Sequence, residues 1–166
     1  VKGVKNQTHL RATKKKLPTS YLDAYGDLEA ALRHAREKLG ATRIIAWGSS
    51  YSASLVLRLA AEHPEEVTAV MSFSPGEYYK KQGRAYIQSF AKQVKQPLFV
   101  TSSKKERSQV EPIFEASPAE KKILFTPASA GQHGSRALWS QWFDSDVYWV
   151  AVNGFLEEYA PPKAPN

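Results

Sequence analysis

Four short apolar segments, each followed by a turn of small or polar residues, alternate with helical patterns along this chain of 166 residues. The four segments are nearly all apolar, so both of their faces should be buried. This is typical of strands in a parallel sheet with helices on both sides. The sequence therefore predicts an α/β fold, a three-layer sandwich around a mostly parallel sheet. The expected strands are residues 43–48, 67–73, 97–101 and 122–126.

The segments around these strands place apolar residues three and four positions apart, which is the spacing of one helix face. Ser20, with Asp23 three residues later, should cap the first helix, and Gly40 should end it. Pro112 weakens the pattern that contains it, because proline has no amide hydrogen. The expected helices are residues 21–39, the segment between the first turn and Pro64, and residues 83–94, 107–116 and about 147–159.

The chain shows no internal repeat and no linker, so we expect one domain spanning residues 1–166. Residues 1–20 are basic and weakly patterned, and should form a loop or an element separated from its structural context. The tail at 161–166 should be disordered. No secretory signal is visible and the chain starts at Val1, so cytoplasmic and exported locations both stay open.

The net charge of +7 is concentrated at the start of the chain. Residues 1–16 hold six lysine or arginine residues and no acid, while the other 150 residues carry 17 basic and 16 acidic side chains. The lysine pairs among these 150 residues are not accompanied by aromatic side chains on which bases could stack. We therefore expect no nucleic-acid partner, and keep nucleic-acid binding through residues 1–16 as a third hypothesis for function.

The absence of cysteine excludes disulfides, thiolate metal sites and a cysteine nucleophile. The histidines have no ligand-like spacing, so we expect no structural or catalytic zinc site. No apolar stretch is long enough to cross a bilayer. The four histidines are His9, His34, His63 and His133.

Three polar loops follow the first, third and fourth expected strands, at residues 48–52, 102–106 and 131–134. Right-handed crossovers put the carboxyl ends of parallel strands at one edge of the sheet, where α/β proteins carry their sites. We therefore expect the three loops to converge, although they are far apart in sequence.

The first loop, Gly48-Ser49-Ser50-Tyr51-Ser52, resembles the nucleophile elbow of the α/β-hydrolases, which reads G-x-S-x-G between a strand and a helix. The turn is so tight that the residues two before and two after the nucleophile must be small, and Gly48 and Ser52 meet this requirement around Ser50. Ser52 replaces the second glycine and would strain the turn if its φ were positive. The alternative interpretation is a serine that only caps the helix.

The resemblance covers residues 21–160 and implies the order Ser, acid, His along the chain. A serine hydroxyl needs a base within hydrogen-bond reach. His133, in the loop after the last expected strand, matches that position. The backbone amide of Tyr51 would be one oxyanion donor.

The acid is expected a few residues beyond the third strand. Glu106 has this spacing, with glutamate in place of the usual aspartate. Its basic neighbours leave an exposed ion pair as an alternative role for Glu106. Other candidates for the acid are Glu77, Asp144 and Asp146.

Several strands precede the elbow in this family, whereas this chain has one helix and a basic segment there. The resemblance therefore implies that another chain or segment supplies those strands, together with the second oxyanion donor. Without them the sheet has an exposed edge.

Within the family, the chain looks most like the dienelactone-hydrolase-like and related serine esterases, on the evidence of Ser50-Tyr51-Ser52-Ala53 and Phe73-Ser74-Pro75-Gly76. True dienelactone hydrolases use cysteine, which this chain lacks. The resemblance therefore implies a hydrolase that cleaves general carboxylic esters rather than lactones, through an acyl-enzyme and without a cofactor. The alternative is a non-catalytic binding module on the same fold. The alternative role of the aromatic candidates for the pocket is core packing or an interface. The candidate pocket residues are Glu77, Tyr78, Tyr79, Trp139 and Trp142.

Overall fold

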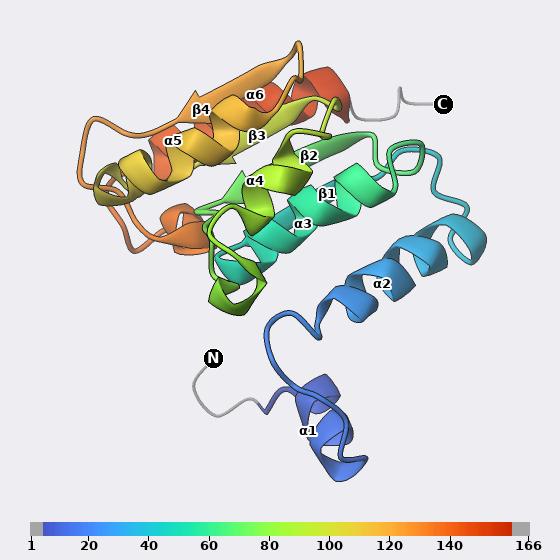
Figure 1. Cartoon of the computed structure of the whole chain (residues 1–166). Coiled ribbons are helices and arrows are strands. Elements are labelled where there is room, and N and C mark those ends of the chain that lie inside the picture. Colours follow the sequence, from blue (N-terminus) through green and yellow to red (C-terminus); the bar gives the residue numbers. More distant parts are fainter. Residues whose placement is uncertain (1–4, 161–166) are drawn as a thin grey trace.

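A parallel sheet in the order β1-β2-β3-β4 forms the centre of the described part of the chain (Figure 1). The computed structural model describes residues 5–160. In register, Ile45 lies opposite Ala69, and Leu98 lies between Val70 and Lys122. The expected parallel α/β sheet and its four strands are confirmed. The strands are β1 (Ile45–Ser49), β2 (Ala69–Phe73), β3 (Leu98–Thr101) and β4 (Lys122–Phe125).

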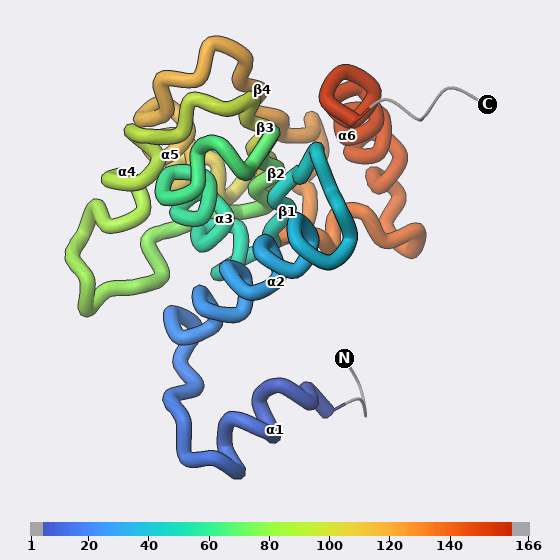
Figure 2. The backbone as a smooth tube through the Cα atoms, turned by 90° about the vertical axis from the view of Figure 1, so that its right-hand side faces the viewer, coloured from blue at the N-terminus to red at the C-terminus, as the bar shows by residue number. Residues whose placement is uncertain are grey.

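Helices cover both faces of the sheet, as expected. Helices α3, α4 and α5 lie on one side, α6 lies on the other, and α2 packs beside α3 (Figure 2). The helix predicted at 83–94 is shorter than expected, while the last helix begins slightly earlier. The bounds are α2 (Tyr25–Glu37), α3 (Tyr51–Glu62), α4 (Tyr86–Ala91), α5 (Arg107–Ala116) and α6 (Ser145–Tyr159), with short 3₁₀ turns η1 (Lys80–Gln82), η2 (Lys104–Glu106) and η3 (Gly134–Leu138).

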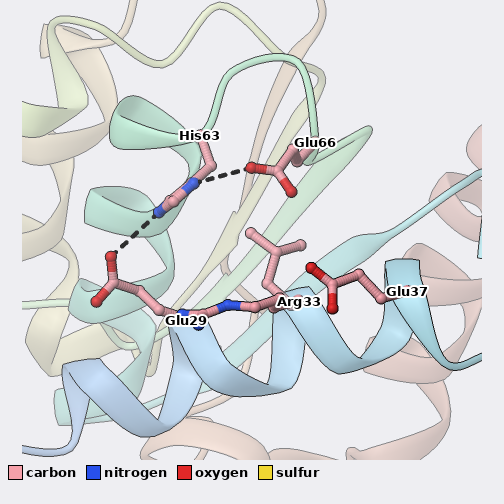
Figure 3. Close-up of a pocket in the computed structure, with 6 residues that line it drawn as sticks. Glu29, Arg33, Glu37, His63 and Glu66 are labelled. Carbon is pink, nitrogen blue, oxygen red and sulfur yellow. Dashed lines mark hydrogen bonds and ion pairs between the residues drawn. The ribbon is translucent and has the colours of Figure 1, made fainter.

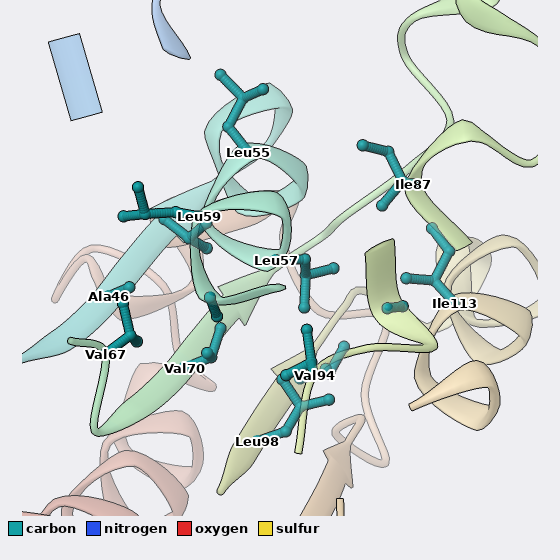
Figure 4. Packing of buried hydrophobic residues seen from close by; sticks show 14 of the residues in the cluster. Ala46, Leu55, Leu57, Leu59, Val67, Val70, Ile87, Val94, Leu98 and Ile113 are labelled. Atoms are coloured by element: carbon teal, nitrogen blue, oxygen red, sulfur yellow. The ribbon is translucent and has the colours of Figure 1, made fainter. Parts of the chain in front are cut away.

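Two apolar clusters fill the space between the layers. Successive side chains of a strand point to opposite faces, so Val70 packs on the α3 side while Met71 packs against α6. Leu57 of α3 is fully buried in the larger cluster (Figure 4). Burying one such side chain contributes roughly 1.5–3 kcal/mol. The core thus holds α3, and with it the turn before α3, firmly against the sheet.

Helix α2 is attached to the body by a polar and aromatic network. The Tyr25 hydroxyl donates to Glu62 at 2.6 Å, and Arg58 Nε donates to the same carboxylate at 2.9 Å. The Arg58 guanidinium lies 3.8 Å from the centre of the Tyr25 ring, within cation–π range. Tyr25 and Leu32 are the buried residues of α2.

The expected cap at Ser20 is wrong. The backbone amide of Ser20 donates to Asp23 at 2.6 Å, but this bond closes a turn before the helix, which begins at Tyr25. Gly40, with φ of 64°, follows the end of α2 as expected.

The basic start of the chain contains a helix, α1 (Gln7–Lys14), where a loop or an isolated element was expected. Asn6 caps it by accepting from the His9 amide at 3.0 Å, and none of its residues is buried. Figures 1 and 2 show α1 standing away from the sheet. The tail predicted to be disordered, 161–166, lies outside the described residues. Over residues 5–160, no helix has the length and apolar character needed to cross a membrane.

Replacing Leu57 with alanine should leave a cavity between α3 and the sheet. We expect the Leu57→Ala variant to lose about 2–5 kcal/mol of unfolding free energy in urea denaturation. The matched control is Leu39→Ala, since Leu39 is 72% exposed and should change stability by less than about 0.5 kcal/mol. Equal losses in the two variants would contradict this description of the core.

Candidate active site

Ser50 sits in a strained turn between β1 and α3. Its backbone has φ of 60° and ψ of −126°, a region that non-glycine residues rarely occupy. Such a conformation costs of order 1–3 kcal/mol and persists only where the surroundings enforce it. Here the Ser50 amide donates to the Phe73 carbonyl at 2.8 Å, which ties the turn to β2. The Ser50 side chain makes no helix-capping hydrogen bond, so its hydroxyl does not serve the alternative role of a cap.

Small neighbours allow the turn to close. A β-carbon on Gly48 would lie 2.2 Å from the Ser52 carbonyl oxygen, so only glycine fits without a backbone shift. The expected strain at Ser52 is absent, because Ser52 lies within α3 and its φ is not positive. Its hydroxyl accepts from the Ser49 amide at 2.9 Å and donates to the Ser49 carbonyl at 2.8 Å. The residue that replaces the second glycine therefore braces the turn.

His133 joins the loops after β1 and β3. Its Nε2 lies 2.8 Å from Ser50 Oγ, although 83 residues separate the two in sequence. Its Nδ1 is hydrogen-bonded to Glu106 Oε1, 27 residues away. A neutral imidazole with its proton on Nδ1 donates to the carboxylate and accepts from the serine hydroxyl. The side chain of His133 is 39% exposed and that of Glu106 only 19%, so the chain of hydrogen bonds runs from the surface inward.

The loop that carries His133 packs directly on the turn at Ser50. The Ser135 amide donates to Ser49 Oγ at 2.8 Å. Gly134 has φ of 59°, and a β-carbon there would lie 2.5 Å from Ser49 Oγ. This close approach requires glycine after His133 and keeps the imidazole beside Ser50.

Glu106 is held as a carboxylate. Its Oε2 accepts from Ser103 Oγ at 2.6 Å, from the Ser103 amide at 3.1 Å and from Ser74 Oγ at 2.9 Å. Burial alone would raise its pKa, but the hydrogen bonds from Ser103, His133 and Ser74 outweigh burial and hold the pKa below its ordinary value. The alternative ion pair with basic neighbours is not formed with Arg107, which instead pairs with Glu111 at 3.3 Å.

Ser74 belongs to this cluster and was not predicted as a site residue. It follows β2, is 1% exposed and has φ of 55°. Its hydroxyl accepts from the Gly134 amide at 2.8 Å in addition to its bond with Glu106. The small-residue turn Ser74-Pro75-Gly76 after a strand was the available signal, but nothing in the sequence indicated which loops the hydroxyl would join.

Tyr78 lies next to the site. Its hydroxyl donates to the Ser74 carbonyl at 2.8 Å, and the residue is 40% exposed. Burial raises the pKa of Tyr78, while its contact with the Ser50 hydroxyl acts in the opposite direction. Of the candidate pocket residues, Tyr78 is thus beside Ser50 and open to solvent.

Glu77 has a different position from the one expected. Its carboxylate accepts from the amides of Ile87 at 2.8 Å and Gln88 at 2.9 Å. These amides lie in the first turn of α4, where a carboxylate is stabilising. Glu77 therefore caps α4, which leaves neither oxygen facing His133.

The two aspartates considered for the acid also have other surroundings. Asp144 is 5% exposed and accepts from Ser129 Oγ at 2.5 Å. Asp146 is exposed in the first turn of α6. The carboxylate that contacts His133 is that of Glu106.

The remaining aromatic candidates differ in exposure. Tyr79 is buried and donates to the Tyr51 carbonyl at 2.7 Å. Trp139 is 45% exposed, and the Arg136 guanidinium lies 5.7 Å from its ring and 5.6 Å from that of Trp142. Tyr79 therefore supports Tyr51 from the interior, whereas Trp139 faces solvent.

Tyr51 is the first residue of α3, so its amide has no partner within the helix. Its side chain stacks on Tyr21 with ring centres 4.3 Å apart. Together with the bond from Tyr79, this stacking fixes the residue that follows Ser50. An anion close to Ser50 would meet the amide and the positive end of α3.

A pocket at the other end of α3 is separate from this site (Figure 3). His63, which follows α3, contacts Glu66 at 3.0 Å and Glu29 of α2 at 3.3 Å. With a rise of 1.5 Å per residue, the 12 residues of α3 put His63 about 18 Å from the turn at Ser50. No group of side chains suited to holding a metal ion occurs within residues 5–160.

Comparisons with known proteins agree on the fold. A family model described as alpha/beta hydrolase fold matches residues 7–121. The esterase domain of a Rhodothermus marinus protein aligns with a TM-score of 0.62 at 18% identity, over 81% of this chain and 68% of that chain. A monoacylglycerol lipase from Paleococcus ferrophilus aligns with a TM-score of 0.59 at 13% identity, over 84% and 76%.

Mouse alpha/beta hydrolase domain-containing protein 10 is a third similar structure, with a TM-score of 0.54 and 12% identity, over 81% of this chain and 70% of that one. At these identities the structures show similarity of fold alone. A search of curated proteins found no match.

The close approach at Gly48 predicts a specific stability loss. We expect Gly48→Ala to lower the unfolding free energy by about 1–3 kcal/mol, because the new methyl group would overlap the Ser52 carbonyl. Gly26→Ala is the control: nothing lies within 4 Å of its β-carbon position in α2, and alanine favours helix by roughly 0.5–1 kcal/mol. Thermal unfolding of both variants measures the difference, and a stable Gly48→Ala protein would refute the argument.

The lowered pKa of Glu106 predicts how stability depends on pH. A carboxyl whose pKa is lower in the folded state stabilises the fold above its ordinary value of 4.5, and this contribution is lost as pH falls through the folded-state pKa. Glu106→Gln should therefore lose less stability on acidification than the parent protein. Urea unfolding across this pH range measures the slopes. The Glu120→Gln variant, at an exposed position, should keep the parent slope, and a parent slope in Glu106→Gln would contradict the assignment.

Proposed function

The chain belongs to the alpha/beta hydrolase fold family, and from this premise we propose that it is a serine hydrolase that cleaves carboxylic esters. The observation that carries the proposal is the hydrogen-bonded chain from Ser50 through His133 to Glu106. The three residues follow β1, β3 and β4 of the sheet, in the order Ser, acid, His that a serine hydrolase of this family requires.

In the proposed reaction, Ser50 Oγ attacks the ester carbonyl while His133 Nε2 accepts the serine proton. Glu106 holds the imidazole tautomer and stabilises the imidazolium. The Tyr51 amide donates to the oxygen that becomes negative. The imidazolium returns its proton to the departing alcohol, and water, activated by the same imidazole, then releases the acid from Ser50. No step in this scheme uses a metal or an organic cofactor.

Small-molecule esters are the proposed substrates. The names of two similar structures, an esterase domain and a monoacylglycerol lipase, support this class. Within the family we propose the serine-esterase branch that resembles dienelactone hydrolases, with serine as nucleophile because the chain has no cysteine. Tyr78 beside Ser50 and the exposed Trp139 are proposed to line the substrate path.

We further propose that another segment or chain pairs with the free edge of β1. Strand β1 lies at the end of the sheet, and no strand precedes it among residues 5–160. Trp47 of β1 is 40% exposed although its ring stacks on Phe73. An added strand would cover this edge, and the loop after it would lie near Tyr51, where a second oxyanion donor is needed. Residues 1–166 would remain one domain within that assembly.

Labelling with a fluorophosphonate tests the proposed nucleophile. The full-length, folded protein should form an adduct that peptide mapping locates at Ser50, because only an activated serine reacts rapidly. Hydrolysis of p-nitrophenyl acetate should fall by at least about three orders of magnitude in Ser50→Ala, and strongly in His133→Gln. Ser89→Ala, at an exposed serine in α4, should behave like the parent protein.

The alternative, a non-catalytic binding module, makes the opposite prediction. If the parent protein hydrolyses the ester and Ser50→Ala does not, the binding module is excluded. A folded, full-length protein that neither takes the label at Ser50 nor hydrolyses the ester would remove the hydrolase proposal.

A further inference from the structure

We propose that Ser74 is a positioning residue that holds the acid Glu106 and the base His133 in place relative to each other, an inference that rests on the proposed function. Its side chain hydroxyl makes two contacts. It donates to Glu106 Oε2 at 2.9 Å and accepts from the Gly134 amide at 2.8 Å. Gly134 directly follows His133, so one oxygen atom connects the carboxylate with the loop that carries the imidazole.

This link joins three separate loops. Ser74 follows β2, Glu106 lies beyond β3 and Gly134 lies beyond β4. The other donors to Glu106 Oε2 come from Ser103, three residues away in the same loop. Ser103 can orient the carboxylate within its own loop, but it cannot set the distance between that loop and His133. The two loops also meet where the Lys104 amide donates to the Ala130 carbonyl at 2.9 Å. Ser74 adds a contact at the carboxylate itself, because its hydroxyl bonds both Glu106 and the residue after His133.

The backbone of Ser74 indicates that its hydroxyl is the important group. Its φ of 55° is a conformation that glycine adopts without steric cost, whereas a residue with a β-carbon is strained there. Its amide donates to the Thr101 carbonyl at 2.7 Å, and its carbonyl accepts from Tyr78 at 2.8 Å. Glycine could make the same two backbone bonds. What serine adds at this strained position is the hydroxyl between Glu106 and Gly134.

This link has a specific consequence when the acid that contacts the imidazole is a glutamate. Glutamate has one more rotatable bond than aspartate, so its carboxylate has more orientations from which to contact an imidazole. Hydrogen bonds to Oε2 leave Oε1 directed at His133 Nδ1. Loss of the Ser74 contact should increase the population of unproductive orientations, and small errors in the placement of catalytic groups lower the rate strongly.

The experiment compares Ser74→Ala and Ser74→Gly with the parent protein. Both remove the hydroxyl, and the glycine variant also removes the backbone strain. We expect kcat for p-nitrophenyl acetate to fall about 10- to 100-fold in both, as for loss of a hydrogen bond to a charged group. KM should change less than about twofold, because Ser74 is 1% exposed and does not reach the substrate.

The matched control is Ser117→Ala. Ser117 is also buried, and it follows α5 at the end away from Glu106. Its hydroxyl donates to the Val94 carbonyl and accepts from the Ala119 amide. This variant loses comparable contacts away from the site, so kcat should stay close to that of the parent. Thermal unfolding curves of all variants verify that they are folded at the assay temperature.

A proton NMR measurement gives a readout that a purely structural role would not change. The His133 Nδ1 proton, bonded to Glu106, should give a downfield resonance in the parent and in Ser117→Ala. In Ser74→Ala and Ser74→Gly this resonance should broaden or shift upfield, because the carboxylate is less firmly oriented. Glu106→Gln identifies the resonance by removing its carboxylate partner.

The outcomes separate this inference from the proposed function. An active parent whose kcat and Nδ1 resonance are unchanged in both Ser74 variants overturns the role of Ser74 and leaves the hydrolase proposal intact. A loss in Ser74→Ala that is absent in Ser74→Gly, an equal loss in Ser117→Ala, or a change confined to KM also overturns it. If the parent takes no label and has no activity, the hydrolase proposal fails, and the NMR comparison alone decides whether Ser74 orients Glu106.

Discussion

The parallel order of the strands is the constraint on which the candidate site depends. Because β1 to β4 run in one direction in consecutive positions, the loops after them emerge at the same edge. Ser50, Ser74, Glu106 and His133 each follow a different strand of this series. The hydrogen bonds among them therefore join loops that follow different strands, and the bond between Ser50 and His133 joins the loops after the first and last strands of the series.

Strain and packing balance each other at this edge. Ser50 and Ser74 both have positive φ, and the amide of Ser50 donates to the carbonyl of Phe73, the residue before Ser74. Each strained residue costs of order 1–3 kcal/mol, while a single fully buried side chain of the core contributes a similar amount. Burial of Leu55 and Leu57 of α3 is therefore of the same order as this strain, and it contributes to holding the turn in its conformation.

The sequence predicted the elements well because each has a local cause. Apolar runs predicted the strands, and Gly48 with Ser52 indicated the tight turn at Ser50. Chain order and loop position selected His133 and Glu106, which the structure brings within hydrogen-bond distance of each other and, through His133, of Ser50. Their catalytic roles, like that of the Tyr51 amide, remain predictions.

The features that the sequence did not predict depend on contacts between distant segments. Glu77 was taken for a pocket residue or an acid, but the amides that it caps belong to a helix ten residues later in sequence. Ser74 has no local signature, since its importance comes from Glu106 and Gly134, which are 32 and 60 residues away. Ser20 has the local pattern of a cap, yet α2 begins only at Tyr25, which is buried in the core cluster together with Leu32.

The free edge of β1 couples the completeness of the sheet to the proposed chemistry. Removing one oxyanion donor from a serine hydrolase lowers kcat by about 10²–10³, and the proposed reaction has a single donor within this chain, the Tyr51 amide. A strand paired with β1 would continue the parallel series by one position, so its following loop would emerge beside Tyr51 at the same edge. In that case the segment that covers Trp47 would also complete the proposed oxyanion site, and assembly of the sheet and the proposed activity would depend on one interaction.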